Sequence, residues 1–346
     1  MIKVELFEEG EEYEYSCFLE DCKYSMAQHT LEWRDVVYEM LKDEPYYFVA
    51  KRDGEIVGVL PSFIKENSLG NVINSIPFAG CYGGVLTKLE NDSDRKEVYK
   101  ALLDVIVRYA EEKECILISI STPPFSEDFD LYEKIFEPEY VMPNFIQYID
   151  LKNSKNYHRN IRRKVKKAID VGVEITDIES SENLDAFYKI YKKRMVEVGG
   201  IISPPNFFKI VKEKAGENSK FIFASYEGKI VSGMLLLYNN NIIDDFYSTM
   251  DVEYNFTEAN SLLTHYAIDW SKEKGIKFWN WQSLPEKESG AYKFKARWGS
   301  SEGKHYYMTK ILGDLTDLRR CSIERLKKEF QWYFVMPYSE LESDGG

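Results

Sequence analysis

The chain repeats one pattern of apolar and polar positions. Residues 47–60 and 220–238 each read as an apolar strand, a tight turn and a second apolar strand. The turns are Asp53-Gly54 and Glu227-Gly228, and an acidic residue before glycine is typical of short hairpin loops. Both stretches therefore predict β-hairpins. Their long offset predicts two copies of one domain rather than a solenoid repeat.

The pattern downstream of each hairpin also repeats. A helical periodicity at 95–112 precedes a charged turn and a strand at 115–120, and the same order recurs at 257–274 and 276–281. A hairpin with an acidic-glycine turn can recur by chance, but here both order and spacing repeat. We therefore expect an α/β fold of mixed sheets in two tandem domains, at 1–150 and 151–338, before a flexible tail at 339–346.

The remaining periodicities predict further elements around these repeats. Expected strands cover residues 2–7, 71–75, 144–151, 173–176, 242–248 and 305–311. Expected helices cover 11–22, 31–41, 153–171, 182–198, 203–214 and 315–334, the last belonging to the second domain. A glycine-rich loop at 76–86 has two interpretations, a backbone that approaches a ligand or a plain crossover between strand and helix.

Charge is distributed unevenly along the chain. The formal net charge of −13 argues against broad nonspecific binding to nucleic acid or anionic membranes. The segment 151–172 nevertheless holds eight Lys and Arg against one Asp. As a helix it aligns Tyr157, Ile161, Val165 and Ile169 in one apolar stripe.

The basic flank of this helix is a candidate site for the phosphates of a nucleotide or tRNA, or for a substrate carboxylate. The alternative interpretation is that these basic residues form the solvent-exposed face of an ordinary packed helix. The candidate binding residues are Arg159, Arg162, Arg163 and Lys166.

Cysteines and apolar runs bear on compartment and cofactors. The five cysteines include no C-x-x-C pair, and their odd number fits no closed disulfide framework, so we expect reduced thiols in a cytoplasmic protein. No His, Cys and Asp grouping has metal-ligand spacing, and we expect no metal cofactor. The N-terminal residues lack an apolar signal core, and no apolar run approaches the length of a membrane span.

Several segments of the second half together resemble a known family. They are the basic RNIRRKVKKAIDVGVEI segment, the EGKIV hairpin, a helix ending WSKEKG, and the run Gly-x-Tyr-x-Phe-Lys-x-x-Trp-Gly at 290–299. In the first half, EIVGVLPSFI and SIPFAGCYGGVL fit the same family. From about residue 46 to 311 the chain resembles the FemAB-like branch of the GNAT acyltransferase superfamily, whose relatives include peptidoglycan-bridge aminoacyltransferases.

The resemblance implies a fold and a reaction. The fold is two tandem GNAT domains, each a splayed mixed sheet flanked by helices. The reaction is N-acyl transfer from an activated donor to an amine, forming an amide by direct attack. Relatives use acyl-CoA, such as acetyl-CoA, or aminoacyl-tRNA, and the implied acceptor is a small amine or a peptidoglycan-precursor-like molecule.

The sequence leaves the donor open. A GNAT enzyme usually seats a pyrophosphate on a glycine-containing loop at a helix start, but the counterpart 251–261 has no glycine and carries Glu258. Ordinary CoA binding is therefore in doubt. The acidic net charge and the lack of an inserted coiled-coil arm favour a small donor instead, and the basic helix serves either polyanion.

Three residues are candidates for the chemistry. Lys295 matches the family position that stabilises the transition state or binds the donor. The alternative interpretation is that Lys295 is an ordinary surface lysine of a helix. Asp244 and Asp245 lie on one predicted strand, where successive side chains face opposite sides, so one of them is buried unless it faces a cleft or a partner. That residue is a candidate general base or amine anchor. Further candidates for binding substrate or donor are Tyr247, Gln282, Ser283, Tyr292 and Arg297.

A second class of function fits the same sequence. Both halves lack a recognisable phosphate loop, which is also expected of a duplicated domain that has lost catalysis and acts as a binding or scaffold protein. Lys295 within its motif and the concentrated positive charge favour the enzyme.

Overall fold

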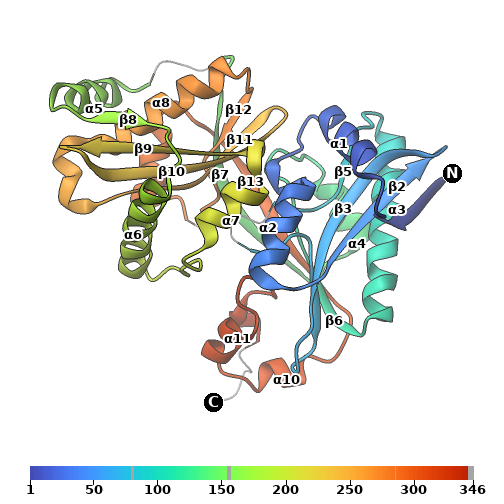
Figure 1. Cartoon of the computed structure of the whole chain (residues 1–346). Helices are drawn as coiled ribbons and strands as arrows, with labels where there is room; N and C mark the ends of the chain where they lie inside the picture. Colours follow the sequence, from blue (N-terminus) through green and yellow to red (C-terminus); the bar gives the residue numbers. More distant parts are fainter. Residues whose placement is uncertain (79–81, 154–156, 285, 342–346) are drawn as a thin grey trace. The chain divides into compact units, whose positions relative to one another are not determined.

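The computed structural model describes residues 1–78, 82–153, 157–284 and 286–341 (Figure 1). It contains two compact units. The first consists of Met1–Phe145 together with Lys304–Gly346, and the second of Ile146–Gly303.

The first unit is built on one sheet with strand order β1-β2-β3-β4-β6-β13, and the short β5 pairs with β3. Its strands are β1 (Ile2–Leu6), β2 (Pro45–Arg52), β3 (Glu55–Lys65), β4 (Asn71–Asn74), β5 (Leu86–Thr87), β6 (Cys115–Ser121) and β13 (Ser301–Ile311). Its helices are α1 (Glu12–Asp21), α2 (Leu31–Leu41), α3 (Asp92–Glu112), α4 (Phe129–Phe136), α10 (Thr316–Arg319) and α11 (Ile323–Glu329). The buried sides of α3 and α4 share an apolar core with the strands.

The second unit repeats this arrangement with strand order β7-β12-β11-β10-β9-β8. Its strands are β7 (Tyr140–Asp150), β8 (Glu174–Thr176), β9 (Ser219–Tyr226), β10 (Lys229–Asn239), β11 (Ile242–Met250) and β12 (Phe278–Asn280). Its helices are α5 (Arg159–Asp170), α6 (Ser181–Val198), α7 (Phe207–Lys214), α8 (Ala259–Glu273) and α9 (Gly290–Ala296). Helices α5 and α8 pack on each other and share one core with the sheet.

The two hairpins correspond residue by residue. In each, both turn residues have positive φ, 55° and 88° at Asp53 and Gly54 and 50° and 75° at Glu227 and Gly228. This is the type I′ turn that matches the twist of paired strands. Each second strand also carries a bulge three residues after the glycine, which leaves Val57 and Val231 without a register partner. The duplication read from the sequence therefore extends to local backbone irregularities.

Among the described strands, each sheet contains one pair of adjacent parallel strands, at the same place in its order. These are β4 with β6 and β11 with β12, while the other pairs within each unit are antiparallel. Parallel neighbours need a long crossover, and α3 and α8 supply it. Both units thus have the mixed sheet that the family resemblance implies.

The predicted domain boundaries differ from the compact units. The sequence assigns 151–338 to the second domain, but the structure groups Lys304–Gly346 with the first unit. The reason is strand pairing, because β13 pairs with β6 through residues 307–311, whereas β7 pairs with β12 through residues 148–150. The last strand of the first sheet, β13, therefore comes after the second half in the sequence, and the last strand of the second sheet, β7, comes after the first half.

Several predicted elements have different limits. The single helix at 315–334 is wrong, because Ser322 accepts a hydrogen bond from the Arg325 amide and starts a separate helix α11. The basic helix begins at Arg159 rather than 153, and residues 154–156 lie outside the described residues. Helix α7 begins at Phe207, four residues after the predicted start, and β12 is shorter than the predicted strand.

Two other expectations fall partly on residues that the structure does not describe. Of the predicted tail, Tyr338–Glu340 forms a 3-10 helix and Leu341 is buried, while 342–346 lie outside the described residues. Residues 79–81 of the glycine-rich loop lie outside them as well. Among the helices that the structure describes, none is both long and apolar enough to cross a membrane.

Candidate functional site

The candidate site lies where β11 and β12 stop pairing. Their parallel register runs from Ile242 opposite Phe278 to Asp244 opposite Asn280, and it ends there. The chain turns after β12 at Gln282, whose φ of +61° is uncommon for a residue other than glycine. Beyond this point the two strands no longer pair with each other, which leaves room for side chains from both to converge on a ligand.

Asp244 is buried and held by two amides. The Nδ2 group of Asn280 donates to one carboxylate oxygen at 2.8 Å, and the Nε2 group of Gln282 donates to the other. Because both oxygens are engaged, this carboxylate fixes the end of β12 and the turn that follows. The sequence identified Asp244 and Gln282 as candidates but not Asn280, which is fully buried in the otherwise apolar FWNW stretch. That polar residue inside an apolar strand was the available signal.

Lys295 reaches the same turn from α9. Its Nζ atom donates to the carbonyl oxygens of Trp281 at 2.5 Å and of Gln282 at 3.2 Å. Burial lowers the pKa of this lysine to about 8, and the negative charges of Asp245 and Asp244 oppose that decrease. The ammonium form is therefore still present near neutral pH, in a site largely withdrawn from water.

Asp245 has different surroundings from its neighbour. It is 8% exposed, and within the described residues its Oδ1 atom has no hydrogen-bond partner. Burial raises the pKa of this carboxyl to about 7; the positive charge of Lys295 lowers it, and the negative charge of Asp244 adds to the increase. A buried carboxyl with an unsatisfied oxygen beside a lysine is typical of a functional site.

The tryptophan of the Phe-Lys motif explains how α9 is held in place. Trp298 is fully buried, and its ring lies 4.8 Å from that of Tyr157 and 6.1 Å from that of Trp281. The hydroxyl of Ser300 accepts a hydrogen bond from the Trp281 indole at 2.8 Å and donates to the Lys295 carbonyl at 2.8 Å. These contacts fix the helix that presents Lys295.

The basic helix α5 presents a charged face to solvent. Its buried residues are Ile161, Val165 and Ala168, whereas Ile169 is 58% exposed, so the predicted four-residue stripe is wrong at its last position. Residues four apart drift by about 40° per step around a helix of 3.6 residues per turn, and the third step leaves the buried face. Ala168 takes that place.

The predicted anion-binding residues all lie on this exposed face. Lys166 pairs with Asp170 at 3.0 Å, and Arg163 donates to the Asn160 side chain at 3.0 Å. In the described part of the chain, the side chains of Arg159 and Arg162 have no ion-pair or hydrogen-bond partner. The His158 amide donates to the Arg297 carbonyl at 3.0 Å, which places exposed Arg297 next to the start of α5.

The start of α8 is acidic and already satisfied. Glu258 precedes the helix and pairs with Lys164 of α5 at 2.7 Å, and the Ala259 amide donates to the Thr257 hydroxyl at 3.2 Å. The sequence did not single out Lys164, which lies on the inner flank of α5. A side-chain pair between two helices leaves no local pattern in the sequence, so this contact of Lys164 was not predictable.

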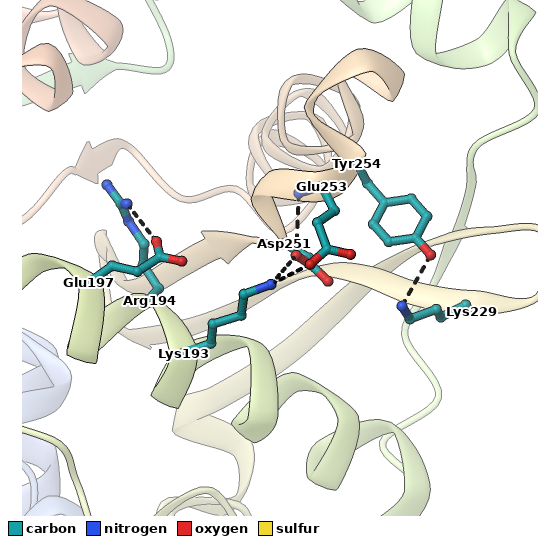
Figure 2. A network of polar contacts seen from close by, with 7 residues as sticks. All are labelled: Lys193, Arg194, Glu197, Lys229, Asp251, Glu253 and Tyr254. Carbon is teal, nitrogen blue, oxygen red and sulfur yellow. Dashed lines mark hydrogen bonds and ion pairs between the residues drawn. The ribbon is translucent and has the colours of Figure 1, made fainter.

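Further contacts fix the segment in front of α8. Figure 2 shows Lys193 of α6 between Asp251 and Glu253, with Nζ–oxygen distances of 3.1 and 2.9 Å. In the same view the Lys229 ammonium donates to the Tyr254 hydroxyl at 3.1 Å. The place where a GNAT enzyme binds a pyrophosphate thus carries three carboxylates, each paired with a lysine of this unit.

The remaining candidates lie outside this constellation. The Tyr247 hydroxyl lies 3.4 Å from that of Ser203, and its ring packs on Tyr191, so it belongs to an aromatic cluster under α6 and α7. Tyr292 is buried in α9, and Ser283 is partly exposed beside Gln282. A search of the described residues finds no group of three or more His, Cys, Asp or Glu that could hold a metal ion.

Comparisons with known proteins identify one domain and the fold. A family model described as an acetyltransferase (GNAT) domain matches residues 155–293, which include Lys164, Asp244 and Asp245. The crystal structure of FemX matches with a TM-score of 0.72 at 14% identity, covering 94% of this chain and 99% of that chain. Residues 155–293 thus match a GNAT acetyltransferase domain, and the whole chain shares its fold with FemX.

Other solved structures have the same tandem fold. L-PGS from Bacillus licheniformis matches with a TM-score of 0.56 at 14% identity, covering 92% of this chain and 95% of that one. A tandem GNAT protein from the clavulanic acid biosynthesis pathway matches with a TM-score of 0.55 at 10% identity, covering 91% and 99%. No curated protein matches the sequence. The match of residues 155–293 to a GNAT acetyltransferase domain supports an acyltransferase.

Proposed function

We propose that this protein transfers an aminoacyl group from aminoacyl-tRNA to an amine. The observation that carries the proposal is the ammonium group of Lys295, held at the open end of the β11–β12 pair beside Asp245. Amide formation passes through a tetrahedral intermediate with a developing oxyanion, and a fixed cation in a site poor in water stabilises that charge.

The reaction is a direct transfer. The free amine of the acceptor attacks the ester carbonyl of the donor, so that a C–N bond forms and the C–O bond to the terminal ribose breaks. The proton lost by the amine goes to the departing ribose hydroxyl. Lys295 lies near the carbonyl oxygen and neutralises it while the charge develops, and Asp244 keeps the supporting turn in place through Asn280 and Gln282.

Two features support tRNA as the donor. The exposed face of α5 offers Arg159, Arg162 and Lys167 as unpaired cations in the described structure, which suits a polyanion. At the start of α8, the three carboxylates of Asp251, Glu253 and Glu258 form ion pairs with only two lysines of the described residues, so a CoA pyrophosphate would meet an excess of negative charge. The name of one structure with this fold, a lysylphosphatidylglycerol synthetase, also denotes an aminoacyl product.

An acyl-CoA donor is the competing proposal, because the tandem GNAT structure from the clavulanic acid pathway is described as the form without AcCoA. The proposed acceptor is a primary amine of a small molecule or of a peptidoglycan-precursor-like peptide, as in the bridge-forming relatives. We place the reaction in the cytoplasm, where both charged tRNA and such precursors occur.

The test is a transfer assay with two labelled donors. The purified protein is incubated with a panel of amines and either a tRNA pool charged with labelled amino acids or labelled acetyl-CoA. Amide product from charged tRNA, lost in Lys295→Met and retained in Lys293→Met, is expected. Product from acetyl-CoA alone would contradict the proposed donor, and no product from either would favour a binding or scaffold role.

A further inference from the structure

Asp245 is a buried carboxylate that the reaction above does not use. Its Oδ1 atom lacks a hydrogen-bond partner within the described residues, although the residue is only 8% exposed. A buried polar oxygen without a partner costs free energy, so such an atom is typically kept for a ligand or a chemical step.

The neighbouring groups restrict which ligand suits this oxygen. The carboxylate of Asp244 is occupied by the Asn280 and Gln282 amides. Lys295 donates two of its three N–H groups to backbone carbonyls of the turn, which leaves the third for the reacting carbonyl oxygen of the donor. The charged groups that act on Asp245 are Asp244 on the same strand and Lys295 from α9. Two carboxylates and one ammonium leave the ionised site with an excess of one negative charge, which a cation would neutralise.

An aminoacyl ester carries its charge in a matching arrangement. The α-ammonium is separated from the reacting carbonyl by a single carbon atom, so a cation-binding group must lie beside the group that stabilises the oxyanion. Asp245 and Lys295 are such neighbours of opposite charge. A fatty acyl or acetyl group has no cation at that position and would leave Asp245 buried and unpaired.

The acceptor amine is a poorer occupant. An ion pair with a buried carboxylate favours the protonated form of an amine, and a protonated amine has no lone pair with which to attack. The α-ammonium of the donor takes no part in bond formation and can stay charged throughout the transfer.

We infer that Asp245 binds the free α-ammonium of an aminoacyl donor, and so selects unblocked aminoacyl esters over neutral or N-blocked acyl donors. This inference rests on the proposed aminoacyl transfer and names the chemical class of its donor. Asp245 is in this view a substrate-binding residue rather than a general base.

The experiment compares one donor pool in two forms. A tRNA pool charged with labelled amino acids is used directly or after chemical acetylation of its α-amines, and both transfer and filter binding are measured. For wild type, kcat/KM is expected to be about 10- to 100-fold lower with the acetylated pool, the range of one charge-assisted hydrogen bond. In Asp245→Asn this preference falls to within about 3-fold, because the carboxamide no longer favours a cation.

Two further variants control for structural effects. Asp245→Glu, which keeps the charge, is expected to recover part of the preference that Asp245→Asn loses. Asp269→Asn removes an exposed carboxylate of α8 and should leave the preference unchanged. Thermal melting of each variant shows whether it is folded.

The two readouts separate failure of the inference from failure of the proposed reaction. Equal use of both pools by wild type, or an unchanged preference in Asp245→Asn, would overturn the inference while tRNA-dependent transfer stands. Binding that prefers the free-amine pool and depends on Asp245, without any transfer, would support the inference and contradict the reaction.

Discussion

At the scale of single residues, two adjacent carboxylates behave differently because their surroundings differ. Asp244 is saturated by two amides, whereas Asp245 has a free oxygen and a pKa raised by burial to about 7. Lys295 is hydrogen-bonded to the turn after β12, and its charge acts on both carboxylates. The chemistry assigned to this site depends on these protonation states, so it makes a prediction about pH.

The rate of transfer should be highest between about pH 7 and pH 8. Lys295 carries its charge below its pKa of about 8, so oxyanion stabilisation is lost as pH increases through that value. Asp245 is ionised above its pKa of about 7, so donor binding is lost as pH decreases through it. Initial rates across pH 5–10 test this. In Asp245→Asn the decrease in rate at low pH should reflect only protonation of the acceptor amine. A wild-type rate that still increases above pH 9 would contradict the role of Lys295.

Replacing Lys295 by methionine keeps the length of the side chain and removes the charge. We expect kcat to fall by about 100-fold or more, as when one oxyanion-stabilising donor is removed, with a smaller change in KM. Lys293→Met changes an exposed lysine of the same helix, which pairs with Glu288 at 3.7 Å, and should alter kcat by less than about twofold. A folded Lys295→Met protein with near-normal kcat would exclude the proposed role.

Part of this site was predictable from sequence. Lys295 follows from its motif, and the Asp244-Asp245 pair follows from two charges on an apolar strand. The difference between the two carboxylates was not predictable, because it depends on the register of β11 against β12 and on Asn280 opposite Asp244. No local pattern in the sequence encodes that register.

At the scale of elements, α5 separates charge by face. Its inner side packs on α8 and pairs Lys164 with Glu258, and its outer side leaves several basic residues exposed. The hydrophobic pattern predicted that a helix exists there, but not its first residue or the exposure of Ile169. The hairpins were predicted more closely, since turn chemistry at the acidic-glycine pairs fixes both the turn and the strand register.

Reversing charge on the outer face of α5 should weaken tRNA binding. The double variant Arg162→Glu/Lys167→Glu removes two cations and is expected to raise Kd by at least about tenfold near 0.1 M salt. The slope of log K against log salt concentration should become shallower by about 1 to 2, because fewer counterions are released.

The matched control makes the same change of net charge elsewhere. Lys100→Glu/Lys134→Glu reverses two exposed lysines of α3 and α4 in the first unit. Filter binding across salt concentrations compares the two. If both double variants weaken binding equally, the effect reflects net charge and α5 is not the binding face.

At the level of the whole chain, the order of the strands in sequence differs from their order in the sheets, because β13 pairs with β6 and β7 pairs with β12. The C-terminal segment belongs to the first unit through β13 and through buried residues such as Leu318 and Phe330. The sequence could not predict this, because hydrophobic periodicity identifies a strand but not its partner. The domain boundary that the sequence predicts at residue 150 follows the order of elements along the chain and takes no account of strand pairing.

Deleting residues 304–346 should therefore destabilise the first unit rather than the second. Removal of β13 exposes the edge of β6 and the apolar side chains that Met308 covers. Hydrogen exchange should show loss of protection in β4 and β6, with protection retained in β9 and β10. Loss confined to the second unit would instead support the boundaries drawn from the sequence.

The central claim is that this GNAT fold uses a charged tRNA rather than CoA. Direct binding of aminoacyl-tRNA and of acetyl-CoA to the purified protein tests it most directly. We predict micromolar or tighter tRNA binding that weakens with salt and in Arg162→Glu/Lys167→Glu, and no saturable binding of acetyl-CoA. Micromolar binding of acetyl-CoA without binding of tRNA would contradict the account.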